Sequence, residues 1–293
     1  MNDASISDEI LVALIKRMRP KLHRYCARMC GSVIDGEDVV QEAVLRAMRA
    51  GANGAGVENL DAWLFRIAHN AALDYLRRES RSPLDPLQDV DLVPDPDSIE
   101  SRLAASASLS LLMRLPSAQR SAVILMDVLG YSLRELSEII GVSVAATKSL
   151  LHRGRENLRD AVRDDSQSSL PPLDASSRER LANYIDRFNA RDFDALRNML
   201  SAEVKLDLVS RVERRGKEDV GEYFSNYSKV FDWRLARGVI EDKDAIFVFI
   251  DGAASPSYFV LIEWQGEKIA KIRDFRYARY VMDSASNIES RAL

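Results

Sequence analysis

The sequence predicts a multidomain protein in which two all-α helical domains are followed by one α+β domain. Three observations support this prediction. Apolar residues recur every three or four positions up to about residue 163. Two proline-containing linkers interrupt the chain, and strand-like alternation begins only after residue 200. We expect helical domains at 1–82 and 101–163, linkers at 83–100 and 164–175, and the α+β domain at 176–293.

The overall composition favours a folded cytoplasmic protein. Of the 293 residues, 46% are hydrophobic, which is enough to build cores, and the net charge of −4 argues against a protein that coats DNA. No apolar run is long enough to cross a bilayer. The first ten residues are acidic where a signal peptide would be basic. We therefore expect a cytoplasmic location and no membrane partner.

One histidine and both cysteines lie close together in the first helical stretch. His23, Cys26 and Cys30 are each about one helical turn apart, a spacing that could just hold zinc. A fourth ligand is not evident, and cysteines in a packed helix behave as small hydrophobic residues. The packed helix is the preferred interpretation, so we expect no metal and no cofactor.

The first helical domain contains a segment with an acidic first turn, GEDVVQEAVLRAMRA, which Gly36 is predicted to open. Negative charge suits a helix N-terminus, so the polar residues are either good helix design or a docking surface for a partner. These polar residues are Glu37, Asp38, Gln41 and Glu42. The side predicted to be buried consists of Val39, Val40, Ala43, Val44 and Met48.

A further amphipathic helix is predicted over 60–81, after a glycine-rich loop at 51–59. One of its faces combines an aromatic ring with polar and basic groups. This face is either ordinary solvated surface or a site that captures an unstacked base, whose stacking is worth about 1–3 kcal/mol. Its residues are Trp63, Arg66, Asn70, Asp74, Arg77 and Arg78.

The second helical domain ends in a predicted helix-turn-helix. A short helix over 132–140 precedes Gly141, which suits a left-handed helix end, and Ser143 is a good N-cap for the next helix. That helix buries a stripe at Thr147, Leu151, Gly154 and Leu158. Its other faces carry small and basic residues suited to a DNA groove. They are Val144, Ala145, Lys148, Ser149, His152, Arg153 and Arg155.

Three motifs in this order resemble a bacterial RNA polymerase sigma factor of the extracytoplasmic-function (ECF) type over about residues 8–163. The motifs are GEDVVQEAVLRA, AWLFRIAHNAALDYLRR and LPSAQRSAVILMDVLGYSLRELSEIIGVSVAATKSLLHRGRENLR. An acidic linker precedes the third motif. The sequence departs from the family pattern at Leu150, where the family usually has Arg, and at Thr147, where it usually has Val.

The resemblance implies partners and residue roles. Residues 1–82 would be sigma region 2, in which Glu37 to Glu42 grip the polymerase and the Trp63 to Arg78 face binds the melted −10 strand. Residues 101–163 would be region 4, whose second helix reads the −35 element in the major groove. The implied partners are core RNA polymerase and promoter DNA.

The last third of the chain has α+β character. Two helices are expected over about 176–200, alternation follows at Val204, Leu206 and Leu208, and strand-like runs follow a helix at 218–227. The order resembles the SnoaL-like cone fold over about 176–283. The resemblance implies a pocket that could bind a small molecule. Candidate pocket residues are Tyr223, Tyr227, Trp233 and Trp264, with Asp232 as a candidate acid.

Three functions remain open. The leading one is an ECF sigma factor that directs core polymerase to promoters and is modulated by its own C-terminal domain. A stand-alone helix-turn-helix regulator with a ligand-sensing domain is the second. The third is a SnoaL-type isomerase or cyclase fused to a DNA-binding module. Because no histidine follows His152, the commonest proton shuttle near neutral pH is missing from the last domain. We therefore expect no catalytic residues and no enzyme activity.

Overall fold

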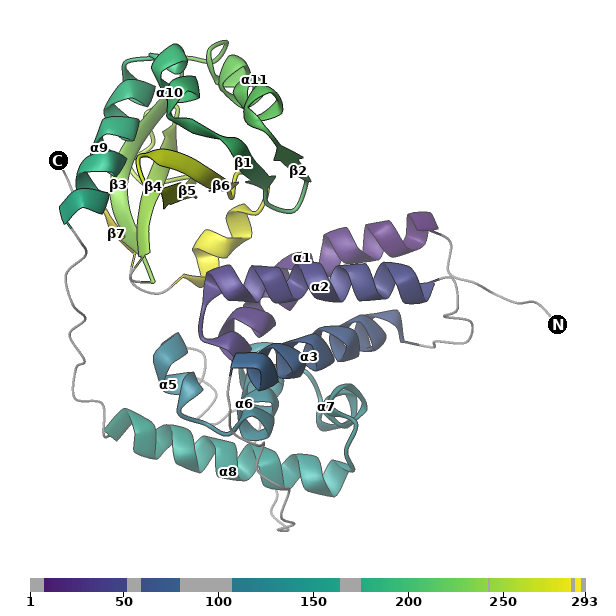
Figure 1. The fold of residues 1–293 in the computed structure, drawn as a ribbon. Helices are drawn as coiled ribbons and strands as arrows, with labels where there is room; N and C mark the ends of the chain where they lie inside the picture. The colour runs from purple at the N-terminus through teal and green to yellow at the C-terminus, as the bar shows by residue number, and fades with distance from the viewer. Residues whose placement is uncertain are drawn as a thin grey trace. The chain divides into compact units, whose positions relative to one another are not determined.

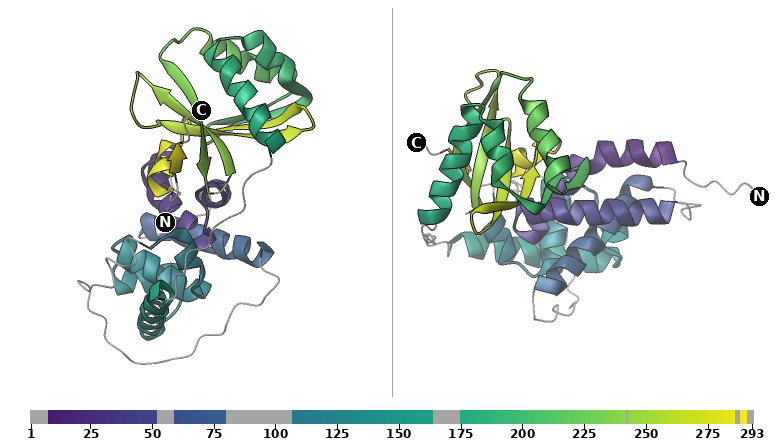
Figure 2. Two further views of the ribbon diagram at one scale, coloured as in Figure 1. Left: turned by 90° about the vertical axis from the view of Figure 1, so that its left-hand side faces the viewer. Right: turned by 45° about the horizontal axis from the view of Figure 1, so that its top comes forward.

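The computed structural model describes residues 8–51, 59–79, 107–163, 175–241, 243–285 and 288–290. The chain forms two compact units, Met1–Gln167 and Ser168–Leu293 (Figures 1 and 2). The expected linker 83–100, nearly all of the linker 164–175 and most of the glycine-rich loop lie outside the described residues.

The first helical module consists, in its described part, of α1 (Asp8–Cys30), α2 (Val33–Gly51) and α3 (Leu60–Glu79). The prediction that Gly36 opens a helix is wrong, because α2 begins three residues earlier. A Cβ atom at Gly36 would lie 2.5 Å from backbone atoms of Ala27 in α1. Only glycine fits here, so this position allows the backbones of α1 and α2 to approach closely.

Both cysteines belong to the core of this module. Cys26 and Cys30 are free and buried. His23 is also fully buried, and its Nε2 lies 2.9 Å from the Val33 carbonyl oxygen, which accepts a hydrogen bond from it. The interpretation of this cluster as a packed helix is confirmed.

The second helical module comprises α5 (Leu109–Met113), α6 (Ser117–Val123), the π-helical segment η1 (Ile124–Val128), α7 (Leu133–Ile140) and α8 (Val144–Arg163). The two modules share one hydrophobic core. Leu22 and Phe65 of the first module belong to the same buried cluster as Leu125, Leu136 and Leu151 of the second. Helix α3 packs against α7 at this junction (Figure 1).

The second unit is an α+β domain, as predicted. Helices α9 (Ala175–Asn189), α10 (Phe193–Met199) and α11 (Lys217–Tyr227) accompany strands β1 (Leu200–Leu208), β2 (Val212–Arg215), β3 (Trp233–Ile240), β4 (Lys243–Ile250), β5 (Tyr258–Gln265), β6 (Lys268–Asp274) and β7 (Ile288–Ser290). The strand order is β2-β1-β6-β5-β4-β3-β7. Every neighbouring pair is antiparallel except β1 and β6. A core of aliphatic and aromatic residues lies between the helices and the sheet.

Candidate nucleic-acid interface

Two N-caps and one left-handed glycine define the ends of the two helices in the helix-turn-helix. A capping box starts α7, in which the Ser132 side chain accepts from the Glu135 amide and the Glu135 carboxylate accepts from the Ser132 amide. Gly141 ends the helix with φ of 81°, in the left-handed region. Ser143 Oγ then accepts from the Ala146 amide at 3.1 Å and caps α8. The predicted turn and cap are confirmed.

Helix α8 packs through the predicted stripe. Thr147, Leu151, Gly154 and Leu158 are all buried, and a Cβ atom at Gly154 would lie 2.7 Å from Val123 of α6. The residues Val144, Ala145, Lys148, His152 and Arg153 are exposed or partly exposed. They form one small and basic surface, which we call the α8 face. Its contact with DNA stays a prediction.

Two of the residues predicted for this surface do not lie on it. Ser149 and Arg155 are buried, with 2% and 7% of their surface exposed, so the prediction that they face DNA is wrong. Leu150, where the family usually has Arg, is also buried. A leucine at that position contributes packing.

Arg155 fixes α8 to the segment η1, which precedes α7 in the chain. Its Nε and Nη2 donate to the two carboxylate oxygens of Asp127 at 2.9 and 2.5 Å. The Asp127 side chain is 1% exposed, and it lies in the π-helical segment η1. A bidentate pair of this kind defines orientation as well as distance, so Arg155 positions the α8 face.

The predicted −10 face of α3 is largely open to solvent. Arg66, Asn70, Arg77 and Arg78 are exposed, whereas Trp63 is partly buried against the core. Asp74 accepts from Arg46 at 2.7 Å and from Arg77 at 3.0 Å. The Arg46 hydrogen bond lowers the pKa of Asp74, so this carboxylate neutralises part of the basic face. The binding of melted DNA stays a prediction.

The predicted polymerase surface on α2 needs two corrections. Glu37 is fully buried and pairs with Arg19 at 2.5 Å, so it cannot belong to an open docking surface. Met48, predicted to be buried, is 54% exposed. Glu42 is only partly exposed and pairs with Arg46 at 2.9 Å.

A different stripe of α2 faces solvent. Asp38, Gln41, Leu45 and Met48 follow one another at helical steps of three and four, and all are exposed or partly exposed. Leu45 is 48% exposed. We call these four residues the α2 stripe. The periodicity of the sequence did not predict that Leu45 and Met48, the apolar end of this stripe, are exposed.

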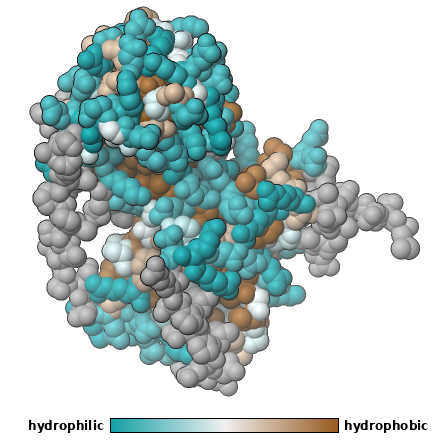
Figure 3. Space-filling view, in the orientation of Figure 1, coloured by the Kyte–Doolittle hydropathy of each residue, from teal (hydrophilic) through white to brown (hydrophobic). Residues whose placement is uncertain are grey.

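A second exposed apolar surface lies on α1. Figure 3 shows brown, apolar residues over the N-terminal half of this helix, where Ile10 and Val12 are exposed.

The candidate ligand pocket of the second unit is nearly filled. Tyr223 and Tyr227 are buried, and both hydroxyls donate to Asp274 Oδ2 at 2.8 Å. The Arg276 amide donates to Asp274 Oδ1 at 2.8 Å. The cavity that these tyrosines line has a volume of about 10 Å³, barely enough for one water molecule.

Asp274 was not predicted from the sequence. It is fully buried, and the loss of solvent raises its pKa. Of the other candidates, Trp233 packs edge-on against Tyr227 with ring centroids 4.3 Å apart. Trp264 instead lies under Arg180, which is 5.8 Å from its ring centre. Asp232 is exposed. The arrangement is a packed aromatic cluster around one carboxyl group.

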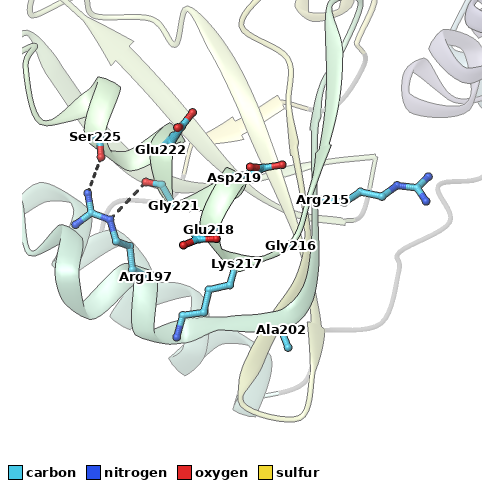
Figure 4. A pocket seen from close by; sticks show the side chains of 10 residues that line it. All are labelled: Arg197, Ala202, Arg215, Gly216, Lys217, Glu218, Asp219, Gly221, Glu222 and Ser225. Carbon is cyan, nitrogen blue, oxygen red and sulfur yellow. Dashed lines mark hydrogen bonds between the residues drawn. The ribbon is translucent and has the colours of Figure 1, made fainter.

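An open groove of about 880 Å³ lies elsewhere on this unit, between α10, α11 and the β1–β2 hairpin (Figure 4). Arg197 crosses it and donates to Ser225 Oγ at 2.9 Å. Lys217 and Glu218 bring opposite charges to the same groove. The candidate pocket residues lie outside its lining.

Comparison with known proteins identifies both helical modules. Residues 14–82 match the family Sigma-70 region 2, and residues 108–158 match Sigma-70, region 4. Among the described residues, no helix combines the length and apolar character that a membrane span requires.

Two relatives from Mycobacterium tuberculosis are ECF RNA polymerase sigma factors. SigG is 35% identical over 213 residues, which cover 63% of this chain but only 57% of SigG. SigM is 38% identical over 150 residues, which cover 50% of this chain and 73% of SigM. The crystal structure of SigJ from the same organism aligns over 90% of this chain and 95% of its own, with 22% identity and a TM-score of 0.36. The matches to SigM and to both sigma regions show that the chain belongs to the ECF RNA polymerase sigma factors.

Proposed function

We propose that the protein directs core RNA polymerase to specific promoters. The observation that carries the proposal is the presence of two different surfaces with basic side chains, the α8 face and the predicted −10 face of α3, on one unit. The α8 face has the shape and charge of a major-groove reader. The α3 face combines the partly exposed Trp63 with Arg66 and Asn70, which suits a single strand with unstacked bases. A stand-alone repressor would not need the second face.

The α2 stripe is the proposed contact with polymerase. It places the Asp38 carboxylate and the exposed Leu45 and Met48 side chains on one line of the helix. Apolar anchors with a polar rim are typical of protein interfaces. This stripe replaces the predicted set in which Glu37 took part.

Variants on the two surfaces are expected to fail in different steps of initiation. Lys148→Ala and Arg153→Ala each remove a cation from the α8 face, and each is expected to weaken −35 DNA binding about 10-fold while core binding stays unchanged. Asp38→Ala and Leu45→Ala are expected to weaken core binding and leave binding of duplex −35 DNA intact. Core pull-down and DNA titration measure the two steps separately.

The matched controls are exposed residues outside both surfaces. Arg163→Ala removes a cation at the end of α8, where the side chain is 79% exposed, and Asp160→Ala removes an exposed acid. Both are expected to behave as wild type. If the α8 and α2 variants lose the same step, the assignment of the two surfaces is wrong.

The second unit is proposed to modulate this activity without catalysing a reaction. Its nearly filled aromatic cluster and the exposed position of Asp232 favour this over an isomerase or cyclase, which needs room for a substrate beside its acid–base pair. A small-molecule ligand of the aromatic cluster would first have to open the cavity there.

Truncation after Asp165 tests the proposed modulation. Coupling between sites commonly changes an equilibrium about 5-fold or more, so we expect transcript levels from in vitro transcription with core polymerase to differ by about that factor between the truncated and full chains. The control is the full chain with Tyr223→Phe, which keeps the domain and removes one hydroxyl. Equal transcript levels from the truncated and full chains would remove the second unit from regulation.

A further inference from the structure

Cations and aromatic rings alternate along one surface of the second unit. The guanidinium carbon of Arg211 lies 4.4 Å from the centre of the Tyr277 ring. The guanidinium carbon of Arg276 lies 5.9 Å from the centre of the same ring and 4.8 Å from the centre of the Trp233 ring. These distances are within the range of cation–π attraction. We call Arg211, Tyr277, Arg276 and Trp233 the arginine–aromatic stack.

Backbone hydrogen bonds hold the two ends of this stack together. Strands β1 and β6 are parallel neighbours, and the Val209 amide, just after β1, donates to the Asp274 carbonyl at the end of β6 at 3.0 Å. This bond brings Arg211, two residues later, beside the loop that carries Tyr277. Asp274 Oδ1 accepts from the Arg276 amide at 2.8 Å, while its Oδ2 accepts from two buried tyrosine hydroxyls. The buried Asp274 therefore anchors the turn on which half of the stack lies.

The stack is open to solvent, and its cations are available to an anion. Arg211 and Tyr277 are exposed, the tyrosine by 41%, and the other two members are partly exposed. Within the described ranges of the chain, neither Arg211 nor Arg276 forms an ion pair with a carboxylate. Arg215, four residues after Arg211, instead pairs with Glu213 at 3.2 Å. The surface thus combines exposed aromatic area with positive charge that is not used within the described structure.

A single-stranded nucleic acid fits this arrangement better than other anions do. A guanidinium that lies against an aromatic ring can donate from its edge to a phosphate and stack its outer face on a base. The exposed Tyr277 ring adds a second surface for stacking. A small anion or an acidic polypeptide would use the cations but not the ring, and a duplex keeps its base faces within its own stack.

We propose that the arginine–aromatic stack is a third nucleic-acid site, which binds the phosphates and unstacked bases of a melted promoter strand. The identity of that strand rests on the proposed function, whereas single-strand binding by the stack does not. The site gives the second unit a direct means of modulating initiation. A contact that forms only with melted DNA favours the open promoter over the closed one.

Substitutions in the stack are tested in the full chain with the background Arg66→Ala, Asn70→Ala, which removes two exposed groups of the predicted −10 face. The probe is a labelled oligothymidine single strand. Tyr277→Ala is expected to weaken its binding about 5-fold or more, the lower limit for the loss of one base stack. Arg211→Ala should also weaken binding, and it should reduce the slope of log affinity against log salt by about 0.7, the value for one phosphate contact of a single strand.

Two controls separate stacking from charge. Arg211→Lys keeps the cation but loses the planar group, so the salt slope should stay unchanged while the affinity falls. Arg215→Ala removes the same charge from the same hairpin, where the side chain is 68% exposed and paired with Glu213, and it should bind as the background does. Equal losses in Arg215→Ala and Arg211→Ala would overturn the site, because any cation would then serve. If Tyr277→Ala loses its fold, the Arg211 variants decide by the same criteria.

Photocross-linking of the wild-type chain shows where the strand lies. With thiothymidine in the oligonucleotide, we expect cross-links in residues 273–281 as well as in α3, and cross-links confined to α3 would overturn the proposal. The surface would belong to an acidic polypeptide instead if a peptide of the acidic residues 83–100 displaced the strand while Tyr277→Ala bound it unchanged. Core pull-down keeps the two proposals apart. A chain that cross-links through 273–281 but never binds core polymerase would sink the proposed function and leave the single-strand site standing.

Discussion

Replacement of Arg155 by alanine is expected to destabilise the first unit by about 3–5 kcal/mol, the cost of breaking a buried ion pair by removing one partner. The variant would remove the bidentate partner of the Asp127 carboxylate, whose side chain is 1% exposed, beneath α8. Because this pair orients α8 against η1, binding to duplex −35 DNA should fall with the stability. Urea unfolding followed by helicity, together with a DNA titration, measures both effects.

An exposed ion pair of the same module provides the control. Arg134 pairs with Glu138 at 3.4 Å, but its side chain is 88% exposed, so Arg134→Ala should change stability by less than about 1 kcal/mol. Replacing both partners, Arg155→Met with Asp127→Leu, should recover much of the stability lost in the single variant, because no buried charge remains unpaired. A single Arg155→Ala variant as stable as Arg134→Ala would contradict the structural role assigned to the pair.

The helix-turn-helix shows what periodicity can and cannot predict. The capped turn at Gly141 and Ser143 and the stripe that begins at Thr147 follow from local rules, and the structure has them. The burial of Arg155 does not follow from local rules. It depends on Asp127, 28 positions earlier, which lies opposite only after η1 has formed. A basic residue beside a buried stripe is normally solvent-facing, so sequence reasoning assigned it to the DNA surface.

Long-range pairing explains the other errors. Glu37 pairs with Arg19 across the α1–α2 contact, and that contact is close because Gly36 faces Ala27. Asp274 at the end of β6 could be recognised only when β6 and α11 meet, which brings two tyrosine hydroxyls to one carboxylate oxygen. The order of helices and strands needs no such information, which is why the fold class was predictable while individual site residues were not.

Acidification is expected to destabilise the first unit before any ordinary carboxylate titrates. Burial lowers the pKa of both His23 and His69 from 6.5 to about 4. The unfolded chain therefore binds more protons than the folded chain below pH 6.5, so stability is lost as pH falls through 6.5 and the loss continues towards pH 4. Between pH 6.5 and 5 each histidine should remove about 1.6 kcal/mol.

Fluorescence of Trp63 alone can follow the unfolding of the first unit separately from the second. The chain has three tryptophans, and Trp233→Phe with Trp264→Phe leaves Trp63 as the reporter of urea unfolding. His23→Gln and His69→Asn should each flatten the pH slope by about half. A slope that is the same in both variants as in the wild type would contradict the assignment. The two buried sites also differ in what they report: His23 bonds within the first module, while His69 Nδ1 lies 3.3 Å from Ser121 Oγ of the second module. The His69 contribution therefore reports the contact between the two modules, and the His23 contribution reports the folding of the first module alone.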